Sequence, residues 1–458
     1  MAPGTERLSV REKVGYGLGD AAANFIFQTM IIFQLAFYTD TFGITAAAAG
    51  TLFLVVRVFD AAFDPLMGVV ADRTNTRWGK FRPWVLWTAV PFGIMGFLAF
   101  ATPDLSASGK LVYAYVTYIL LMMVYSANNL PYSALSGVMT GDAVERTSLS
   151  SYRMLFAMLS QLVIQGAALP MVKYFGKGND ALGYKWTMGI FSVLAIVFFV
   201  TTFLTTRERV QPDPKQKSSI KQDFTDLLSN GPWKAMFALT VILFITLAMR
   251  GGVMLYFFKY YVKREDFFGW FNVIGTGATI IGLLLSKPIA ERIGKKPLFL
   301  YGLVGTVIFT GAFILLPASN LPVIVTMEAL RQFAYGFTIP LLWAMMADVA
   351  DFSEWKTHRR ATAVIFSAII FGLKAGLGFG GAIGGYLLSF YGYVPNVEQT
   401  EHALLGIRLT ASIYPAIAFA LCAVCLAFYR IDKTTELEMS AELTERRANF
   451  VTPLPTAP

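Results

Sequence analysis

Long apolar stretches recur from one end of the chain to the other. A transmembrane α-helix needs about 20 apolar residues to cross a hydrocarbon core about 30 Å thick. Membrane-spanning β-strands would instead give short segments of alternating polarity. Charged residues make up 15% of the 458 residues, whereas soluble domains carry about 25%. The sequence therefore predicts an all-α membrane protein that crosses the bilayer many times.

The apolar stretches give twelve predicted transmembrane helices, six before and six after a polar segment. We expect an N-terminal six-helix bundle at 1–206, a linker at 207–231, a C-terminal six-helix bundle at 232–432 and a tail at 433–458. Similar charged loops follow the second and eighth spans, which favours two bundles related by a pseudo-two-fold axis along the membrane normal. The predicted spans are 14–38, 46–70, 83–101, 111–139, 150–174, 184–205, 232–261, 267–289, 298–316, 321–350, 361–389 and 403–429.

Lys and Arg residues are concentrated on one side of the predicted membrane. With the N-terminus in the cytoplasm, most of them fall in cytoplasmic loops, as is typical of membrane proteins. We therefore expect a multi-pass protein of the cell (inner) membrane with both termini in the cytoplasm. The same bias accounts for the formal net charge of +9 without a nucleic-acid partner.

Two carboxylates lie one helical turn apart in the second predicted span. Asp60 and Asp64 share a helix face, and Arg57 lies on the same face three residues before Asp60. A charge at the bilayer centre costs about 2.5–3.5 kcal/mol, so these groups need a water-filled cavity or a bound ion. We interpret the pair as a site for Na⁺ or H⁺. The alternative is a helix end whose charged groups reach the lipid headgroups.

Groups that donate and accept hydrogen bonds recur in the first, fourth, fifth and eleventh spans. A solute with many hydroxyl groups needs both kinds of partner, so we predict a sugar-binding site in the membrane. Tyr125, Tyr132 and Trp343 would either stack on a sugar ring or pack in the core. The predicted substrate-binding residues are Asp20, Asn24, Asn129, Arg153 and Lys374.

The sequence offers little for catalysis or for a metal centre. Cys422 and Cys425 lie within the last apolar stretch, and no other Cys or nearby His completes a metal site. His358 and His402 fall in predicted loops. We therefore expect the protein not to be an enzyme and to have no catalytic residues. We also expect no cofactor or metal beyond the coupling cation. If that cation is a metal ion, it would be Na⁺ at Asp60 and Asp64.

Several motifs occur together in a known family of transporters. They are Lys13-Val-Gly-Tyr-Gly-Leu-Gly-Asp20, Asp60-Ala-Ala-Phe-Asp64-Pro-Leu-Met-Gly68, Arg77-Trp-Gly-Lys-Phe-Arg-Pro-Trp84 and Met345-Met-Ala-Asp348. With them the chain resembles the glycoside–pentoside–hexuronide:cation symporters, which include the bacterial melibiose permease, within the major facilitator superfamily. The resemblance implies the major facilitator fold. It also implies import of a sugar, glycoside, pentoside or hexuronide coupled to Na⁺ or H⁺ by alternating access.

The resemblance also implies roles for single residues. Asp60 and Asp64 match the acids of the family's cation site, and Ser126 lies where a threonine ligand can occur. Arg153 and Lys374 match positions near the sugar and the coupling network.

The chain departs from the melibiose-type pattern at several positions. Asn24 and Asn129 lie where those members carry sugar-binding aspartates, and Ser133 replaces a tryptophan that stacks on the sugar, which disfavours an α-galactoside. Phe63 replaces an asparagine that supports Na⁺ coupling in some relatives, which favours H⁺, although Asp20 adds an acid nearby.

Several questions stay open at the level of sequence. They are the identity and charge of the sugar, the coupling ion, the stoichiometry and the role of Arg250. Arg250 precedes Gly251 and Gly252, and we expect a broken helix or close packing in this span. We expect a small-molecule sugar and the lipid bilayer as partners, and a monomer. A carrier of an amphipathic or lipid-like solute is the alternative function.

Overall fold

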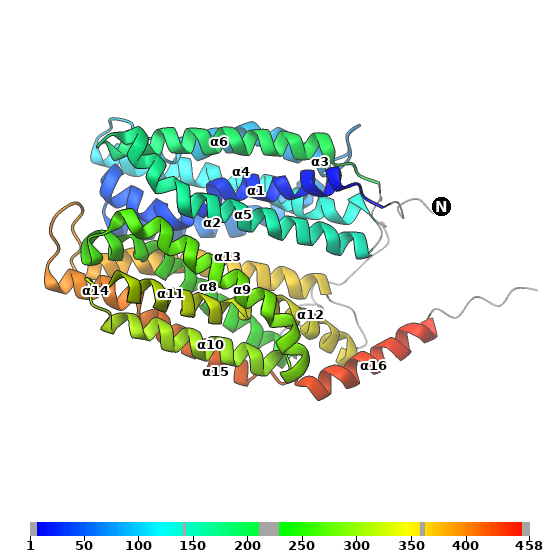
Figure 1. The fold of residues 1–458 in the computed structure, drawn as a ribbon. Helices are drawn as coiled ribbons and strands as arrows, with labels where there is room; N and C mark the ends of the chain where they lie inside the picture. The colour runs from blue at the N-terminus through cyan, green and yellow to red at the C-terminus, as the bar shows by residue number, and fades with distance from the viewer. Residues whose placement is uncertain (1–6, 141–142, 210–228, 358–361, 451–458) are drawn as a thin grey trace, which may run out of the picture. The chain divides into compact units, whose positions relative to one another are not determined.

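The computed structural model describes residues 7–140, 143–209, 229–357 and 362–450. Regular structure in these ranges is helical, with one isolated bridge between Thr76 and Gly79 (Figure 1). Eleven helical segments of the described chain are long and apolar enough to cross a membrane. The remaining predicted span, the third, forms α3 (Arg82–Leu98), which has 17 residues. The predicted all-α membrane architecture is therefore confirmed.

The helices follow the predicted spans, although two of the spans are divided. The tenth span consists of α11 (Leu321–Gly336) and α12 (Thr338–Thr357), and the twelfth consists of α14 (Glu401–Ala411) and α15 (Ile413–Ala427). The remaining membrane helices are α1 (Val10–Ala36), α2 (Ala46–Arg73), α4 (Ala107–Met139), α5 (Ala143–Gly176), α6 (Asp180–Thr205), α8 (Gly231–Tyr256), α9 (Phe268–Ile293), α10 (Lys295–Ala312) and α13 (Thr362–Phe390).

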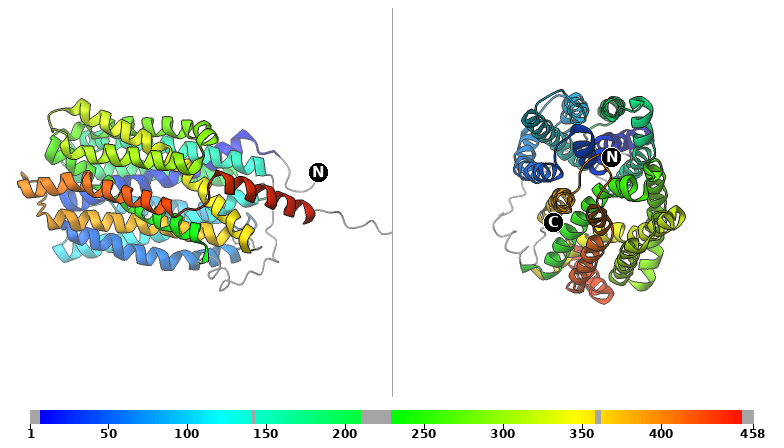
Figure 2. Two further views of the ribbon diagram at one scale, coloured as in Figure 1. Left: turned by 90° about the horizontal axis from the view of Figure 1, so that it is seen from below. Right: turned by 90° about the vertical axis from the view of Figure 1, so that its left-hand side faces the viewer.

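A further helix, α16 (Lys433–Phe450), lies in the predicted tail and packs against α12. Figure 2 shows it in red as a separate helix beyond α15. Most of the predicted linker, 210–228, and the last residues, 451–458, lie outside the described part of the chain.

Side-chain caps explain where two of the helices begin. At the start of α1, Ser9 and Glu12 form a reciprocal capping box, which satisfies backbone N–H groups that have no partner inside the helix. At the start of α3, the carboxylate of Glu208 accepts three consecutive backbone N–H groups, those of residues 80–82, at 2.7–2.8 Å. A carboxylate at a helix N-terminus also interacts favourably with the helix dipole. The Arg77–Trp84 motif is thus anchored by an acid distant in sequence.

Two π-helical turns occupy equivalent positions in the two halves of the sequence. The turn η1 (Phe37–Phe42) follows the first span, and η2 (Phe257–Val262) follows the seventh. Each ends in a left-handed residue, Gly43 with φ 85° and Lys263 with φ 57°. Glycine adopts this conformation without strain, whereas a residue with a Cβ rarely does.

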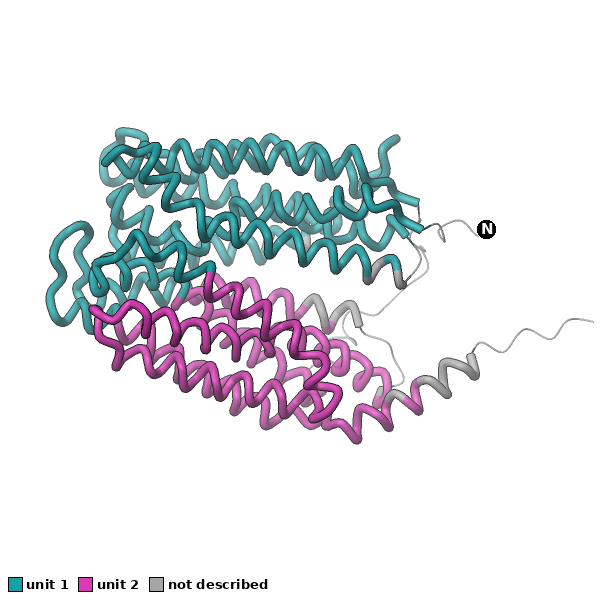
Figure 3. Tube along the Cα trace, in the orientation of Figure 1, with its two compact units in different colours: residues 1–215, 251–273, 381–407 teal, residues 216–250, 274–380, 408–458 magenta. Residues whose placement is uncertain are grey.

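The chain folds into two compact units, which Figure 3 colours teal and magenta. Unit 1 contains 1–215, 251–273 and 381–407, and unit 2 contains 216–250, 274–380 and 408–458. Unit 1 therefore includes short parts of the C-terminal half of the sequence. The bundle boundaries at 1–206 and 232–432 describe the sequence halves and stay a prediction.

Glycines of α13 allow close helix packing within each unit. In unit 1, a Cβ on Gly385 would lie 2.5 Å from the carbonyl oxygen of Ala46 on α2. In unit 2, a Cβ on Gly380 would lie 2.3 Å from the carbonyl oxygen of Ile245 on α8. Small residues let membrane helices approach closely and gain van der Waals contact. Larger side chains at these positions would force the helices apart.

Three buried charges meet in the core of unit 2. Glu328 accepts hydrogen bonds from Arg250 at 2.8 Å and from Arg331 at 2.5 Å. The three residues are 5% exposed or less, and Arg250 also donates to the carbonyl oxygen of Ala411 at 3.0 Å. Because α8 continues to Tyr256, the helix break considered near Arg250 is absent from this described helix. Arg250 instead neutralises a buried acid.

We expect Glu328→Gln to lower the free energy of unfolding by about 3–5 kcal/mol, because it leaves two buried guanidinium groups without a counter-charge. Thermal unfolding in detergent measures this loss. The matched control is Glu398→Gln, whose pair with Lys263 has side chains 86% and 68% exposed. The control should change stability by about 0.5 kcal/mol or less. Equal losses of stability in the two variants would contradict a stabilising role for Glu328 as the counter-charge of Arg250 and Arg331.

Candidate functional site

The predicted cation-site acid Asp60 is buried in unit 1 between charged and polar partners. Ser126 on α4 donates its hydroxyl to one carboxylate oxygen at 2.8 Å, and Arg57 donates to the other at 3.1 Å. Asp60 is 3% exposed and Ser126 is fully buried. The spacing on α2 predicts the contact with Arg57, and the structure adds the contact with Ser126 across helices.

Asp64 lies one turn further along α2 and is partly exposed, as is its neighbour Phe63. Asp60, Asp64 and Ser126 together offer carboxylate and hydroxyl oxygens, which are the hard ligands that alkali cations prefer. The same carboxylates can instead accept a proton. The chemistry of this set fits either predicted coupling ion.

A second ion pair in unit 1 joins α1 to α5. Asp20 forms an ion pair with Arg153 at 3.3 Å, and Arg153 also donates to the hydroxyl of Ser133 at 3.4 Å. The guanidinium carbon of Arg153 lies 5.1 Å from the centre of the Tyr132 ring, a cation–π distance. Asn24 donates to the backbone oxygen of Asp20 at 2.8 Å. Three predicted substrate residues are therefore brought together.

Aromatic residues near this pair pack in the core. Tyr16 and Tyr132 each donate a hydroxyl to the other's backbone oxygen, at 3.1 Å and 2.5 Å, and their rings stack with centres 4.7 Å apart. Tyr132 is fully buried, which favours core packing over stacking on a sugar. Tyr125 stacks on Phe27 at 5.0 Å and is partly exposed.

The other predicted substrate residues are less closely assembled. Asn129 on α4 is partly buried, and its neighbour Asn128 is the one that donates to Thr88, at 2.7 Å. Lys374 is a partly buried residue of α13 in unit 2. Roles for Asn129 and Lys374 in substrate binding stay predictions.

One polar cluster of unit 1 is missed by reasoning from sequence. The Asp40 cluster consists of Asp40 on η1, Lys259 and Tyr260 on η2, and Tyr393 and Asn396 before α14. Lys259 and Tyr393 both contact the Asp40 carboxylate, and Tyr260 donates to it at 2.7 Å. Burial raises the pKa of Tyr393, so its phenol stays protonated and donates. The available signal was an acid and a base in the two equivalent turns.

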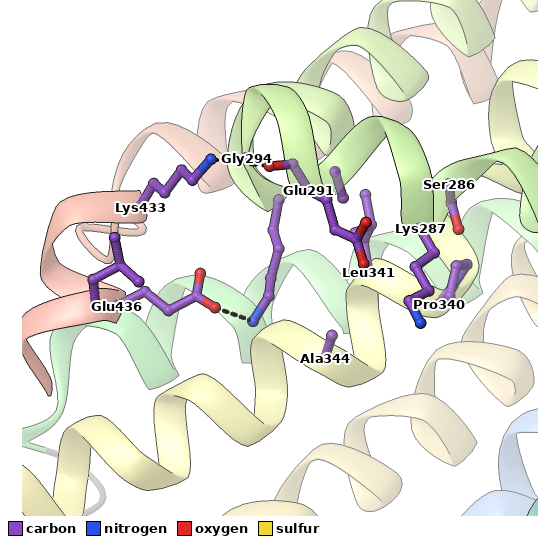
Figure 4. A pocket seen from close by; sticks show the side chains of 12 residues that line it. Ser286, Lys287, Glu291, Gly294, Pro340, Leu341, Ala344, Lys433 and Glu436 are labelled. Carbon is purple, nitrogen blue, oxygen red and sulfur yellow. Dashed lines mark hydrogen bonds and ion pairs between the residues drawn. The ribbon is translucent and has the colours of Figure 1, made fainter. Parts of the chain in front are cut away.

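A cavity of about 350 Å³ lies in unit 2 beside the loop between α9 and α10. Figure 4 shows its charged side chains, among them Lys433 and Glu436. Lys295 pairs with Asp348 at 2.7 Å and with Glu436 at 2.9 Å. These contacts tie α10, α12 and α16 together.

Comparison with solved structures shows that the chain shares its fold with known membrane transporters. A bacterial homolog of the human lysosomal transporter Spinster, in an inward-facing and unoccupied conformation, matches with a TM-score of 0.66, 14% identity, and coverage of 94% of this chain and 98% of its own. The nucleoside transporter NupG matches with a TM-score of 0.63, 14% identity, and coverage of 92% and 99%. At this identity the likeness shows the fold alone, and it agrees with the predicted fold of two helical bundles.

Comparison of sequences then gives the family. The family model described as an MFS/sugar transport protein matches residues 15–433. The inner membrane symporter YicJ of Escherichia coli is 37% identical, covering 96% of this chain and 95% of its own, and the isoprimeverose transporter of Lactiplantibacillus pentosus is 37% identical, covering 98% and 93%. The glucuronide carrier protein homolog of Escherichia coli is 33% identical, covering 96% and 97%. The chain therefore belongs to the sugar-transport family of the major facilitator superfamily, in its glycoside–pentoside–hexuronide:cation symporter branch.

We expect Ser126→Ala to lower the free energy of unfolding by about 1.5–3 kcal/mol, because the mutation removes a buried hydrogen bond to a charged group. Ser136→Ala is the control, since the Ser136 hydroxyl donates to a backbone oxygen of its own helix at 3.0 Å. The control should cost about 1 kcal/mol or less. Thermal unfolding in detergent compares the two. Equal losses of stability would show that the hydrogen bond from Ser126 to Asp60 contributes no more than the one within the helix at Ser136.

Proposed function

We propose that the chain is a symporter that couples the inward movement of Na⁺ or H⁺ to the import of a sugar, glycoside, pentoside or hexuronide. The symporters and sugar carriers among its relatives support this function, since they align over nearly the whole chain. Transport, rather than catalysis, is the activity that this family carries out. The proposal needs no cofactor beyond the coupling ion.

The observation that carries the proposal is the gathering of charged groups in the interior of unit 1. Asp20 pairs with Arg153, and Asp60 pairs with Arg57. Asp64 adds a third carboxylate on the same face of α2 as Asp60. The three carboxylates offer oxygen atoms that can bind a Na⁺ or accept an H⁺. Net charge in the membrane interior is costly, so a Na⁺ or H⁺ beside these acids would favour closure around the site.

Alternating access gives the coupling. The two predicted six-helix bundles rock around a central site, and cation and sugar each stabilise the same closed state. Each ligand then raises the affinity for the other by the same factor. One positive charge moving inward across 100 mV releases about 2.3 kcal/mol, which supports about 50-fold accumulation of a neutral sugar.

The proposed setting follows from the basic loops and the apolar helices. We place the protein in the cell (inner) membrane as a monomer surrounded by lipid, with both termini in the cytoplasm. The Asp40 cluster would then lie on the external side, and the Lys295 pairs on the cytoplasmic side.

Asp60→Asn and Asp64→Asn should each abolish accumulation, so that the internal-to-external sugar ratio falls from about 50 to about 1. Exchange of sugar down its gradient should persist, because the amide removes the cation response without removing the translocation pathway. Uptake of a panel of radiolabelled sugars into vesicles, under separate Na⁺ and pH gradients, measures both quantities and identifies the ion.

The control is Asp104→Asn, an exposed carboxylate between α3 and α4, which should accumulate sugar as the wild type does. Normal sugar accumulation by both Asp60→Asn and Asp64→Asn would show that the cation binds elsewhere. A wild type that transports only amphipathic lipids from a mixed panel would instead support the alternative of a lipid-like solute.

A further inference from the structure

Arg153 is the basic residue among the predicted substrate residues of unit 1, and Asp20 pairs with it. Its guanidinium contacts the Asp20 carboxylate at 3.3 Å and the Ser133 hydroxyl at 3.4 Å, and it lies over the Tyr132 ring. The Arg153 side chain is 30% exposed and that of Asp20 is 14% exposed. The pair is thus accessible in part, with the base more open than the acid.

Two contacts hold the backbone of α1 around Asp20. Its backbone oxygen accepts from the Asn24 side chain at 2.8 Å, one turn along α1. The neighbouring Gly19 allows close packing, because a Cβ there would lie 2.4 Å from the Tyr132 ring. The acid is therefore held beside Arg153 by the packing of α1 against α4 and α5.

An arginine binds an anionic sugar and a neutral sugar through different interactions. A hexuronate carboxylate is recognised best when a guanidinium offers two parallel N–H donors. Asp20 occupies part of that donor set and adds a like charge next to the incoming carboxylate. A neutral hydroxyl needs one donor or one acceptor, and the Asp20–Arg153 pair offers both without a net charge.

We propose that Asp20 is a specificity-determining residue, which neutralises Arg153 and thereby makes the site select uncharged glycosides or pentosides over hexuronides. This inference rests on the proposed function and narrows its substrate class. Part of this selectivity comes from repulsion, because the Asp20 carboxylate repels a hexuronate as well as offering a hydrogen-bond acceptor to an uncharged sugar. It also agrees with the proposed coupling, because a neutral solute adds no charge beside the unit 1 acids, where the cation would bind.

The test compares sugars that differ only in charge. The probes are methyl β-glucoside and methyl β-glucuronide, the corresponding methyl galactoside and galacturonide, and methyl xyloside as a pentoside. Each competes against uptake of whichever labelled sugar the wild type accumulates. In the wild type, the neutral member of a pair should compete at a concentration at least tenfold lower than the uronide. In Asp20→Asn, this ratio should fall at least fivefold, through stronger competition by the uronide.

Two further variants separate specificity from folding. Asp20→Glu keeps the charge, so it should retain the neutral preference even if its transport is slower. Asp266→Asn removes an exposed acid that pairs with Arg264 at 3.0 Å, and should leave the ratio unchanged.

Each outcome has one meaning for the inference. A wild type that prefers the uronides, or an Asp20→Asn ratio equal to that of the wild type, overturns it while leaving the symport proposal intact. If Asp20→Asn does not fold, the wild-type and Asp20→Glu ratios decide, and a uronide preference in either overturns the inference. Accumulation of no sugar by the wild type, under either ion gradient, overturns the proposed function itself.

Discussion

A charge inside an apolar helix must find a counter-charge, and this requirement organises the polar interior of both units. In unit 2, Glu328 is enclosed by Arg250 and Arg331, and all three are nearly inaccessible. In unit 1, Arg57 pairs with Asp60 and Arg153 with Asp20, and Arg153 keeps part of its surface open. The closed set suits a structural role, and the partly open set suits ligands that come and go.

Much of the architecture could be predicted because membrane helices satisfy their own backbone groups. Length and hydropathy alone therefore located the spans, and helical spacing predicted the shared face of Arg57 and Asp60. Contacts between helices could not be obtained in this way. The donation from Ser126 to Asp60, the link between Arg250 and Glu328, and the Asp40 cluster each join residues far apart in sequence, and no local pattern encodes such partners.

The division between local and distant information also explains the aromatic residues. The aromatic ring of Tyr132 could stack on a sugar, yet its reciprocal hydrogen bonds with Tyr16 hold it in the core. Sequence shows what a side chain is able to do, whereas packing decides which of its faces remains available. The same reasoning applies to Arg153, because its partner Asp20 compensates the charge of the guanidinium group.

The two π-helical turns show that one backbone form can carry two different chemical groups. Both carry a left-handed residue at the end, and in each the cap N–H bonds to the oxygen of the second residue of the turn, Tyr38 or Phe258. The fourth residues of the turns, Asp40 and Tyr260, bond to each other. Two acids facing each other at these positions would repel. The two turns therefore share a backbone form, while an acid on one turn and a phenol on the other complement each other.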